Sequence, residues 1–390
     1  MHGKVSRMLF STLQNKLELV PVVAVLGPRQ CGKSTLARMF TESLDHFVWL
    51  DLERPTDLRK LDDPETFFSE NGNKLICIDE IQRKPELFAV LRYQVDKTGN
   101  PGQFLILGSA SRDLIRQSSE TLAGRISYLE LTPFLLNEIS SIGTLTKYHS
   151  RGGYPKSFLS ETDRQSFEWR LDFIRDFIER DIPSFNPRLS VQTADRLLRM
   201  ISHMHGQILN INTFAKALGI DSKTVKKYLE LLEGAFVVRL LPPYFSNQKK
   251  RLVKSPKVYV RDTGILHALL QLGDWNSLAG HPIYGYSWES LCIENVLANI
   301  KPEVRYSFYR TSNGAEIDLV LEKGEDRAAV DFKASSAPKV EHGYWLSLDD
   351  LGINNGWIVA PVSEKYSSKG ISVSSLTGFL SAKELRDFLL

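Results

Sequence analysis

The chain has 390 residues, of which 42% are hydrophobic and 24% charged, and its formal net charge is +3. These fractions are close to globular averages, so they exclude a disordered chain and a membrane protein. The charge is too small to identify a nucleic-acid binder. The length exceeds what one hydrophobic core usually serves, so we expect two or three domains.

Targeting and redox signals are weak throughout the sequence. The longest apolar run, residues 19–26, is too short to cross a bilayer, and the N-terminus has no secretory pattern, so we expect a cytoplasmic protein without a membrane partner. Cys31, Cys77 and Cys292 lie far apart and form no C-x-x-C pair. The cysteines therefore predict neither a disulfide framework nor a zinc site, which fits a reducing compartment.

The first chemical signature is a glycine loop between a strand and a helix. The β-branched run at 22–26 predicts a buried strand, and apolar residues after the loop recur at helical spacing. In the pattern G-x-x-x-x-G-K-S, backbone N–H groups cradle phosphate oxygens, the lysine reaches the β and γ phosphates, and the serine ligates Mg²⁺. The loop therefore predicts an ATP site. The residues expected to contact ATP are Gly27, Pro28, Arg29, Gln30, Cys31, Gly32, Lys33, Ser34 and Thr35.

Two further predicted strands end in acidic residues. The strand at 47–50 is followed by Asp51, and the strand at 75–78 is followed by Asp79 and Glu80. Ligands bind at the carboxyl edge of a parallel sheet. We therefore expect Asp79 to hold Mg²⁺ together with the loop serine, and Glu80 to act as the base on the attacking water.

Two more residues are candidates for ATP hydrolysis. The strand at 104–107 runs into Gly108 and Ser109, which places a hydroxyl at the same edge, where it would sense the γ-phosphate or position water. Arg125 precedes another apolar run and is a candidate arginine finger, acting in its own subunit or in a neighbour. A finger from a neighbour implies a homo-oligomer, whereas a solvated surface arginine is the alternative reading.

These motifs resemble a known family, the prokaryotic AAA-type (AAA+) ATPases with a C-terminal domain of uncharacterised function that is partly restriction-endonuclease-like. The resemblance spans nearly the whole chain and implies ATP binding and hydrolysis, but it names no substrate on which that energy acts. It rests on 27–34, Leu50-Asp51, 78–82, 108–111, 122–125 and 131–134, and later on 152–155, 179–182, 259–264 and Trp288-Glu289.

The middle of the chain carries helical patterns. Apolar residues between 161 and 182 fit one helix that Pro183 then stops. Two short amphipathic patterns around 211–218 and 221–232 flank Gly219, which is a helix-turn-helix outline, and a strand at 236–241 follows like a wing. The lysines of the second helix, and the basic loop after the wing, are candidates for contacts with nucleic-acid phosphates. They are Lys223, Lys226, Lys227, Lys249, Lys250 and Arg251. A packing role for the same fold is the alternative.

The C-terminal part contains a predicted hairpin with charged residues. Strands at 316–321 and 328–333 surround a turn, and Asp331 and Lys333 project to the same side of the returning strand, with Asp318 beside them. Glu289 lies on a predicted helix at 287–299. The set resembles the restriction-endonuclease-like core, which implies that Asp318 and Asp331 bind Mg²⁺, Lys333 stabilises charge and Glu289 adds an acid. A solvated hairpin, or a nuclease-like fold without cleavage, is the alternative.

The sequence therefore predicts an α/β protein in three segments: a P-loop AAA-type ATPase domain at 1–140, a helical and winged-helix region at 141–265, and an α/β restriction-endonuclease-like domain at 266–390. The leading functional hypothesis is a Mg²⁺-dependent ATPase that couples nucleotide state to nucleic-acid binding or processing. The alternatives are an ATP-gated DNA nuclease and a nucleotide-switched adaptor that binds a protein partner.

Overall fold

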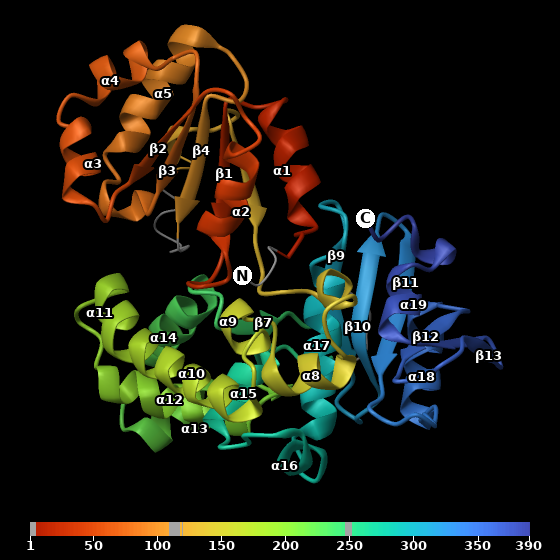
Figure 1. The fold of residues 1–390 in the computed structure, drawn as a ribbon. Coiled ribbons are helices and arrows are strands. Elements are labelled where there is room, and N and C mark those ends of the chain that lie inside the picture. Colours follow the sequence, from red (N-terminus) through yellow and green to blue (C-terminus); the bar gives the residue numbers. More distant parts are fainter. Residues whose placement is uncertain (1–4, 109–117, 119, 246–251) are drawn as a thin grey trace. The chain divides into compact units, whose positions relative to one another are not determined.

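The computed structural model describes residues 5–108, 118, 120–245 and 252–390. Its contacts divide the chain into two compact units (Figure 1). The first unit runs to Phe134 and includes the short segment Gly234–Phe236, and the second comprises Leu135–Glu233 and Val237–Leu390. In these described ranges no helix is both long and apolar enough to span a membrane.

The first unit is built on a parallel sheet of five strands in the order β2-β3-β4-β1-β5. Its strands are β1 (Val22–Leu26), β2 (Phe47–Asp51), β3 (Leu75–Asp79), β4 (Phe104–Gly108) and β5 (Ile126–Glu130). Its described helices are α1 (Leu9–Leu17), α2 (Lys33–Thr41), α3 (Pro55–Lys60), α4 (Pro64–Glu70), the 3₁₀ turn η1 (Ile81–Arg83) and α5 (Leu87–Thr98). The strands predicted from the sequence are confirmed.

Helices cover both faces of this sheet. Alternate residues of the central strands pack against α4 and α5 on one face and against α1 and α2 on the other, as Figure 1 shows. The central strands β1, β3 and β4 are buried along their whole length, which explains why they read as unbroken apolar runs in the sequence. The ordering brings the carboxyl ends of β1, β2, β3 and β4 to one edge, where the nucleotide motifs meet.

The second unit begins with a helical region. Its helices are α7 (Leu136–Ile139), α8 (Leu145–Arg151), α9 (Pro155–Phe158), α10 (Asp163–Asp176), the π-helical turn η2 (Phe177–Asp181), α11 (Ile182–Phe185), α12 (Val191–His203), α13 (Ile211–Leu218) and α14 (Ser222–Gly234). The prediction that Pro183 stops one helix was wrong. The proline lies in the first turn of α11, where its missing N–H group leaves no intrahelical bond unmade.

The predicted pair of amphipathic helices is confirmed as α13 and α14. Gly219 adopts φ 66° at the end of α13, and Asp221 accepts hydrogen bonds from the N–H groups of Lys223 and Thr224, each at 2.9 Å, at the start of α14. A three-stranded antiparallel sheet accompanies the pair, with the order β6-β8-β7. Its strands are β6 (Gln207–Ile208), β7 (Val238–Leu241) and β8 (Lys257–Val260), so β7 begins two residues after the predicted start of that strand.

The C-terminal part of this unit holds a mixed sheet in the order β13-β14-β12-β11-β10-β9. Its elements are α15 (Thr263–Leu269), α16 (Trp275–Ala279), α17 (Tyr284–Leu297), β9 (Arg305–Arg310), β10 (Glu316–Lys323), β11 (Asp326–Phe332), α18 (His342–Leu351), β12 (Gly356–Val359), β13 (Tyr366–Ser368), β14 (Ile371–Ser374), α19 (Leu376–Leu380) and the 3₁₀ turn η3 (Lys383–Leu385). The predicted hairpin is confirmed as β10 and β11, and it turns at Gly324 with φ 62°.

The motifs at 152–155 and 259–264 pack against each other in this unit. The carboxylate of Asp262 accepts a hydrogen bond from the N–H group of Gly153 at 2.7 Å and one from Ile265 at 2.9 Å. A side chain at Gly264 would place its Cβ 2.1 Å from the backbone oxygen of Arg151, so only glycine fits there. These two motifs therefore hold the end of α8 against the start of α15 and stabilise the fold of the second unit.

Candidate functional site

The glycine loop joins β1 to α2 in a conformation that needs its two glycines. Gly32 has φ 103°, a region that favours glycine, and it forms the N-terminal cap of α2. A Cβ on Gly27 would lie 2.2 Å from the backbone oxygen of Leu131, so the loop and the chain after β5 approach too closely for any side chain. The described conformation is therefore that of a phosphate-binding turn at a helix N-terminus.

Lys33 lies inside this loop. Its side chain is buried, and its ammonium group donates hydrogen bonds to the backbone oxygens of Gly27 at 2.9 Å and Pro28 at 2.8 Å. An ammonium group that is hydrogen-bonded to backbone carbonyls in this loop can exchange those carbonyl oxygens for phosphate oxygens. The phosphate-binding role of this lysine stays a prediction.

The two predicted Mg²⁺ ligands lie together. The Ser34 side chain is hydrogen-bonded to Asp79, although the two residues come from different elements. Burial raises the pKa of Asp79, and the carboxylate of Asp51, which lies opposite on β2, raises it further, while the Ser34 hydrogen bond opposes both. A hydroxyl beside a carboxylate at the phosphate loop fits Mg²⁺, whose remaining positions are taken by phosphate and water in sites of this type.

Glu80 follows directly and has an uncommon backbone conformation, with φ 58°. Such a conformation in a non-glycine residue is strained, and it turns this side chain out of the strand path. Burial raises the pKa of the Glu80 carboxyl, and the charge of Asp79 raises it further. Gln82 donates a hydrogen bond to the Glu80 carboxylate and orients it. A carboxylate with a raised pKa is a better general base near neutral pH.

Arg7 was not predicted as part of this site. It is buried, and its guanidinium donates to the backbone oxygens of Cys31 at 3.0 Å and Thr132 at 2.6 Å, and lies 5.1 Å from the centre of the Phe134 ring. One side chain therefore fixes the phosphate loop to the segment 131–134. The sequence held no signal for this contact, because more than one hundred residues separate the two backbone partners.

Two predicted hydrolysis residues are not placed in the site. Arg125 forms an ion pair with Asp96 of α5 and lies before β5, at the amino edge of the sheet. It is thus roughly 16 Å, the length of one five-residue strand, from the loop edge. A finger role in its own subunit does not fit this position, and a role in a neighbour stays a prediction. Ser109 lies outside the described residues.

A second cluster of charged side chains lies in the C-terminal part of the second unit. Leu319 pairs with Val330, which brings Asp318 beside Asp331, and these two carboxyl groups are hydrogen-bonded to each other. Lys333 lies 2.9 Å from Asp331. The structure therefore brings the predicted residues of the hairpin together.

Burial opposes ionisation of both aspartates. Burial acts to raise the pKa of Asp318, but the Lys257 ammonium and the hydrogen bonds from Asp331 and the Phe332 N–H group together outweigh it and hold the pKa of that carboxyl below its usual value. Burial and the charge of Asp318 raise the pKa of Asp331 well above its usual value. Of the two carboxyl groups, Asp331 therefore carries the proton more readily.

Lys257 and Tyr259 complete this cluster and were missed. The Lys257 ammonium lies 3.0 Å from Glu289, and the Tyr259 hydroxyl donates to the same carboxylate. A charged residue alternating with apolar ones in a buried strand was the available signal. In the described ranges, no set of three or more acidic, histidine or cysteine side chains is arranged to hold a metal ion. Lys257 lies among these carboxylates in addition to the predicted Lys333, and the metal-binding role of Asp318 and Asp331 stays a prediction.

Three stretches of the chain match models of known protein families. Residues 20–140 match the model of an AAA domain, residues 142–276 a domain of unknown function (DUF8612), and residues 284–379 a domain of unknown function (DUF4143). Uncharacterised proteins of Mycobacterium bovis and Mycobacterium tuberculosis are each 38% identical over 354 residues, which cover 91% of this chain and 79% of theirs. The chain belongs to the same family as these two proteins, and its residues 20–140 form an AAA-type P-loop domain.

Comparison with solved structures gives matches of low TM-score. The Walker-type ATPase of Pyrococcus abyssi is 15% identical, with a TM-score of 0.47, covering 68% of this chain and 96% of that one. A RuvB variant of Thermotoga maritima is 21% identical, with a TM-score of 0.32, covering 60% of this chain and 89% of that one.

The predicted basic face lies partly within the described residues. Lys223, Lys226 and Lys227 are exposed on α14, and the opposite face of that helix is buried through residues such as Val225 and Tyr228. Lys249, Lys250 and Arg251 lie outside the described residues. The exposed part of the basic face is therefore three lysines on consecutive turns of one helix.

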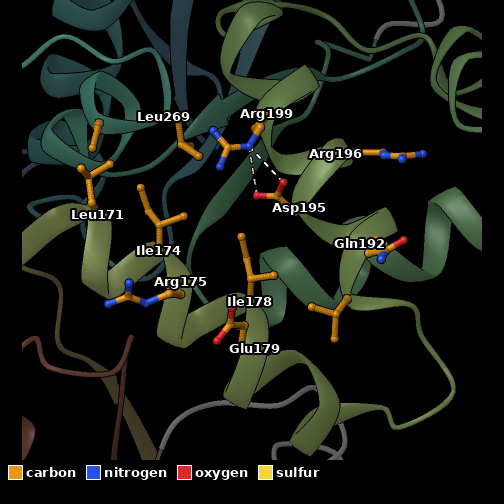
Figure 2. A pocket seen from close by; sticks show the side chains of 12 residues that line it. Leu171, Ile174, Arg175, Ile178, Glu179, Gln192, Asp195, Arg196, Arg199 and Leu269 are labelled. Atoms are coloured by element: carbon orange, nitrogen blue, oxygen red, sulfur yellow. Dashed lines mark hydrogen bonds and ion pairs between the residues drawn. The ribbon is translucent and has the colours of Figure 1, made fainter.

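The helical region also contains a pocket of about 520 Å³ that the sequence did not predict. Figure 2 shows its apolar side chains, from α10, η2 and α15, facing charged groups of α12, where Arg199 pairs with Asp195 at 3.0 Å. Glu179 lines it from the π-helical turn. None of the residues predicted to bind nucleotide, metal or nucleic acid lines this pocket.

Proposed function

We propose that this chain is a Mg²⁺-dependent ATPase whose catalytic residues are those at the carboxyl edge of the first sheet. The observation that carries the proposal is the joint placement of Lys33 inside the phosphate loop, the hydrogen-bonded pair Ser34 and Asp79, and the neighbouring carboxylate of Glu80. The groups come from two segments, the start of α2 and the end of β3, and each has the chemistry that its role requires.

In this mechanism the loop binds the phosphates through its N–H groups and the N-terminus of α2. The Lys33 ammonium leaves the carbonyls of Gly27 and Pro28 and binds phosphate oxygens instead. Ser34 and Asp79 would hold Mg²⁺, which neutralises phosphate charge. Glu80, oriented by Gln82, accepts the proton of the attacking water at its carboxylate.

Replacement of Lys33 tests this proposal. Lys33→Ala removes a charged hydrogen-bond donor to phosphate, so we expect roughly 10 to 100-fold weaker ATP binding and a corresponding loss of turnover. ATP affinity is measured by calorimetry and turnover by phosphate release with Mg²⁺. Lys97→Ala, at an exposed position of α5, is the matched control. Parent-like turnover in Lys33→Ala would exclude the proposed site.

For the output of this ATPase, we propose nucleic-acid binding by the second unit. The segments 1–140, 141–265 and 266–390 expected from the sequence are proposed as its domains. The supporting observation is the exposed row of Lys223, Lys226 and Lys227 on a helix whose other face is buried. Lysines on one exposed helix face contact phosphates without reading base sequence. A protein-binding adaptor without nucleic-acid activity is the competing function.

Salt dependence separates these two outputs. If the three lysines contact phosphates, replacing all three with alanine lowers the slope of log affinity against log salt by about 3, at similar cost for any DNA sequence. Binding is measured by fluorescence anisotropy over a range of salt, and ATP turnover is measured with and without DNA. Lys339→Ala, Lys369→Ala and Lys383→Ala together form a control of equal charge change at exposed positions. Undetectable DNA binding at low salt would favour the adaptor.

A further inference from the structure

The C-terminal cluster has a cation of its own. Lys257 of β8 is buried, and its ammonium nitrogen lies 2.7 Å from Glu316, 3.0 Å from Glu289 and 3.4 Å from Asp318. These carboxylates come from α17 and β10, so the lysine reaches them from a different sheet of the same unit. An ammonium group has three N–H donors, and here three carboxylates surround it.

This ammonium occupies the space that a metal ion would need. Mg²⁺ binds carboxylate oxygens at about 2.0–2.1 Å and strongly prefers an octahedral set of oxygens. Asp318 and Glu289, the acids that a metal would recruit, already face Lys257. A second cation among them would meet a like charge at close range in a buried, low-dielectric environment, which is strongly unfavourable.

The other members of the cluster are also satisfied within the protein. Lys333 lies 2.9 Å from Asp331, Arg310 lies 3.0 Å from Glu316, and the backbone N–H group of Phe332 donates to Asp318 at 3.0 Å. Tyr259 donates to Glu289. Lys333 also lies 3.3 Å from the exposed Glu341. Each of the four carboxylates of the cluster therefore has a partner within the protein without a metal ion.

We propose that Lys257 is the resident cation of this cluster, that the cluster excludes divalent metal ions, and that it holds β8 against α17 and β10 instead of cleaving phosphodiester bonds. The lysine acts through charge and position, and it takes no part in the nucleotide site. The proposal is independent of the ATPase assignment.

Metal binding by the full chain tests it. Mn²⁺ binding is followed by electron paramagnetic resonance in nucleotide-free protein that carries Asp79→Asn, so that the nucleotide site does not contribute. We expect no bound Mn²⁺ at this cluster in that background. Adding Lys257→Ala removes the ammonium and opens the carboxylates, so we expect about one bound Mn²⁺ per chain, lost again when Asp318→Asn is added.

Two controls keep the outcome decisive. Lys257→Arg retains a cation and is expected to bind no Mn²⁺, and circular dichroism checks that each variant is folded. If Lys257→Ala does not fold, Mn²⁺ binding is compared between the Asp79→Asn protein and the Asp79→Asn protein that also carries Asp331→Asn. Negligible Mn²⁺ binding by both proteins supports the proposal. Bound Mn²⁺ that Asp331→Asn abolishes, or Mg²⁺-dependent DNA cleavage by the parent that Asp318→Asn abolishes, would overturn it.

Discussion

Replacing Glu80 with glutamine is expected to lower the rate constant of ATP hydrolysis by about 10²–10⁴-fold while ATP affinity stays close to that of the parent. Loss of a positioned general base typically has this cost. The glutamine keeps the size of the side chain but accepts no proton from water. In the proposed mechanism Glu80 acts on the attacking water and does not hold the phosphates, so the variant should bind ATP without hydrolysing it.

Single-turnover kinetics and equilibrium binding separate the two effects. Glu86→Gln makes the same chemical change at an exposed position before α5 and should leave both quantities unchanged. Asp79→Asn provides a contrast, since removing a ligand of Mg²⁺ should weaken binding of Mg²⁺–ATP as well as turnover. Parent-like hydrolysis by Glu80→Gln would assign the base elsewhere.

Replacing Glu294 with glutamine is expected to destabilise the second unit by about 3–5 kcal/mol, as typically happens when one partner of a buried ion pair loses its charge. The Glu294 carboxylate lies on α17 and accepts hydrogen bonds from Arg239 of β7 and from Arg261, which directly follows β8, the latter at 2.8 Å. All three side chains are largely buried, at 10–14% exposure. The variant would leave two guanidinium groups facing a neutral amide.

The effect should depend on pH in a defined direction. Burial acts to raise the pKa of Glu294, but Arg239 and Arg261 outweigh it and lower the pKa from 4.5 to about 2. The carboxylate therefore contributes its full stability above about pH 4.5, and that contribution of roughly 3 kcal/mol is lost as the pH falls toward 2. The stability difference between parent and variant should shrink over the same range.

Tryptophan fluorescence during urea unfolding measures this difference, because five of the six tryptophans, all but Trp49, belong to the second unit. Glu325→Gln, at the exposed turn of the hairpin, is the matched control and should unfold like the parent. A Glu294→Gln midpoint equal to that of the control at neutral pH would show that the ion pair contributes nothing to stability.

Local chemistry explains which features the sequence predicted. The phosphate loop, the acidic strand ends and the hairpin at 316–333 are defined by neighbouring residues and by period-2 or glycine patterns, which act within one element. Asp318 and Asp331 could be paired because a short hairpin fixes its own register. The same reasoning found the exposed and buried faces of α14.

Long-range contacts explain what the sequence did not predict. Lys257 reaches Asp318 across 61 residues and from another sheet, so no spacing rule connects them. Arg125 precedes its strand, which places it at the amino edge, and a motif position alone does not tell which edge a flanking residue occupies. Pro183 was predicted to stop a helix because proline breaks a helix interior. Proline is tolerated in the first turn of a helix, and the sequence did not show that a new helical turn begins there.

Arg7 connects the phosphate loop to the chain segment that leaves the first unit. Its guanidinium binds the phosphate loop at Cys31 and the exit of the first unit at Thr132, and the exit chain also lies against Gly27. Leu135, the first residue of the second unit, follows three residues later. The same guanidinium therefore holds both the loop backbone and the chain that leads out of the first unit, so a displacement of one would strain its hydrogen bonds to the other.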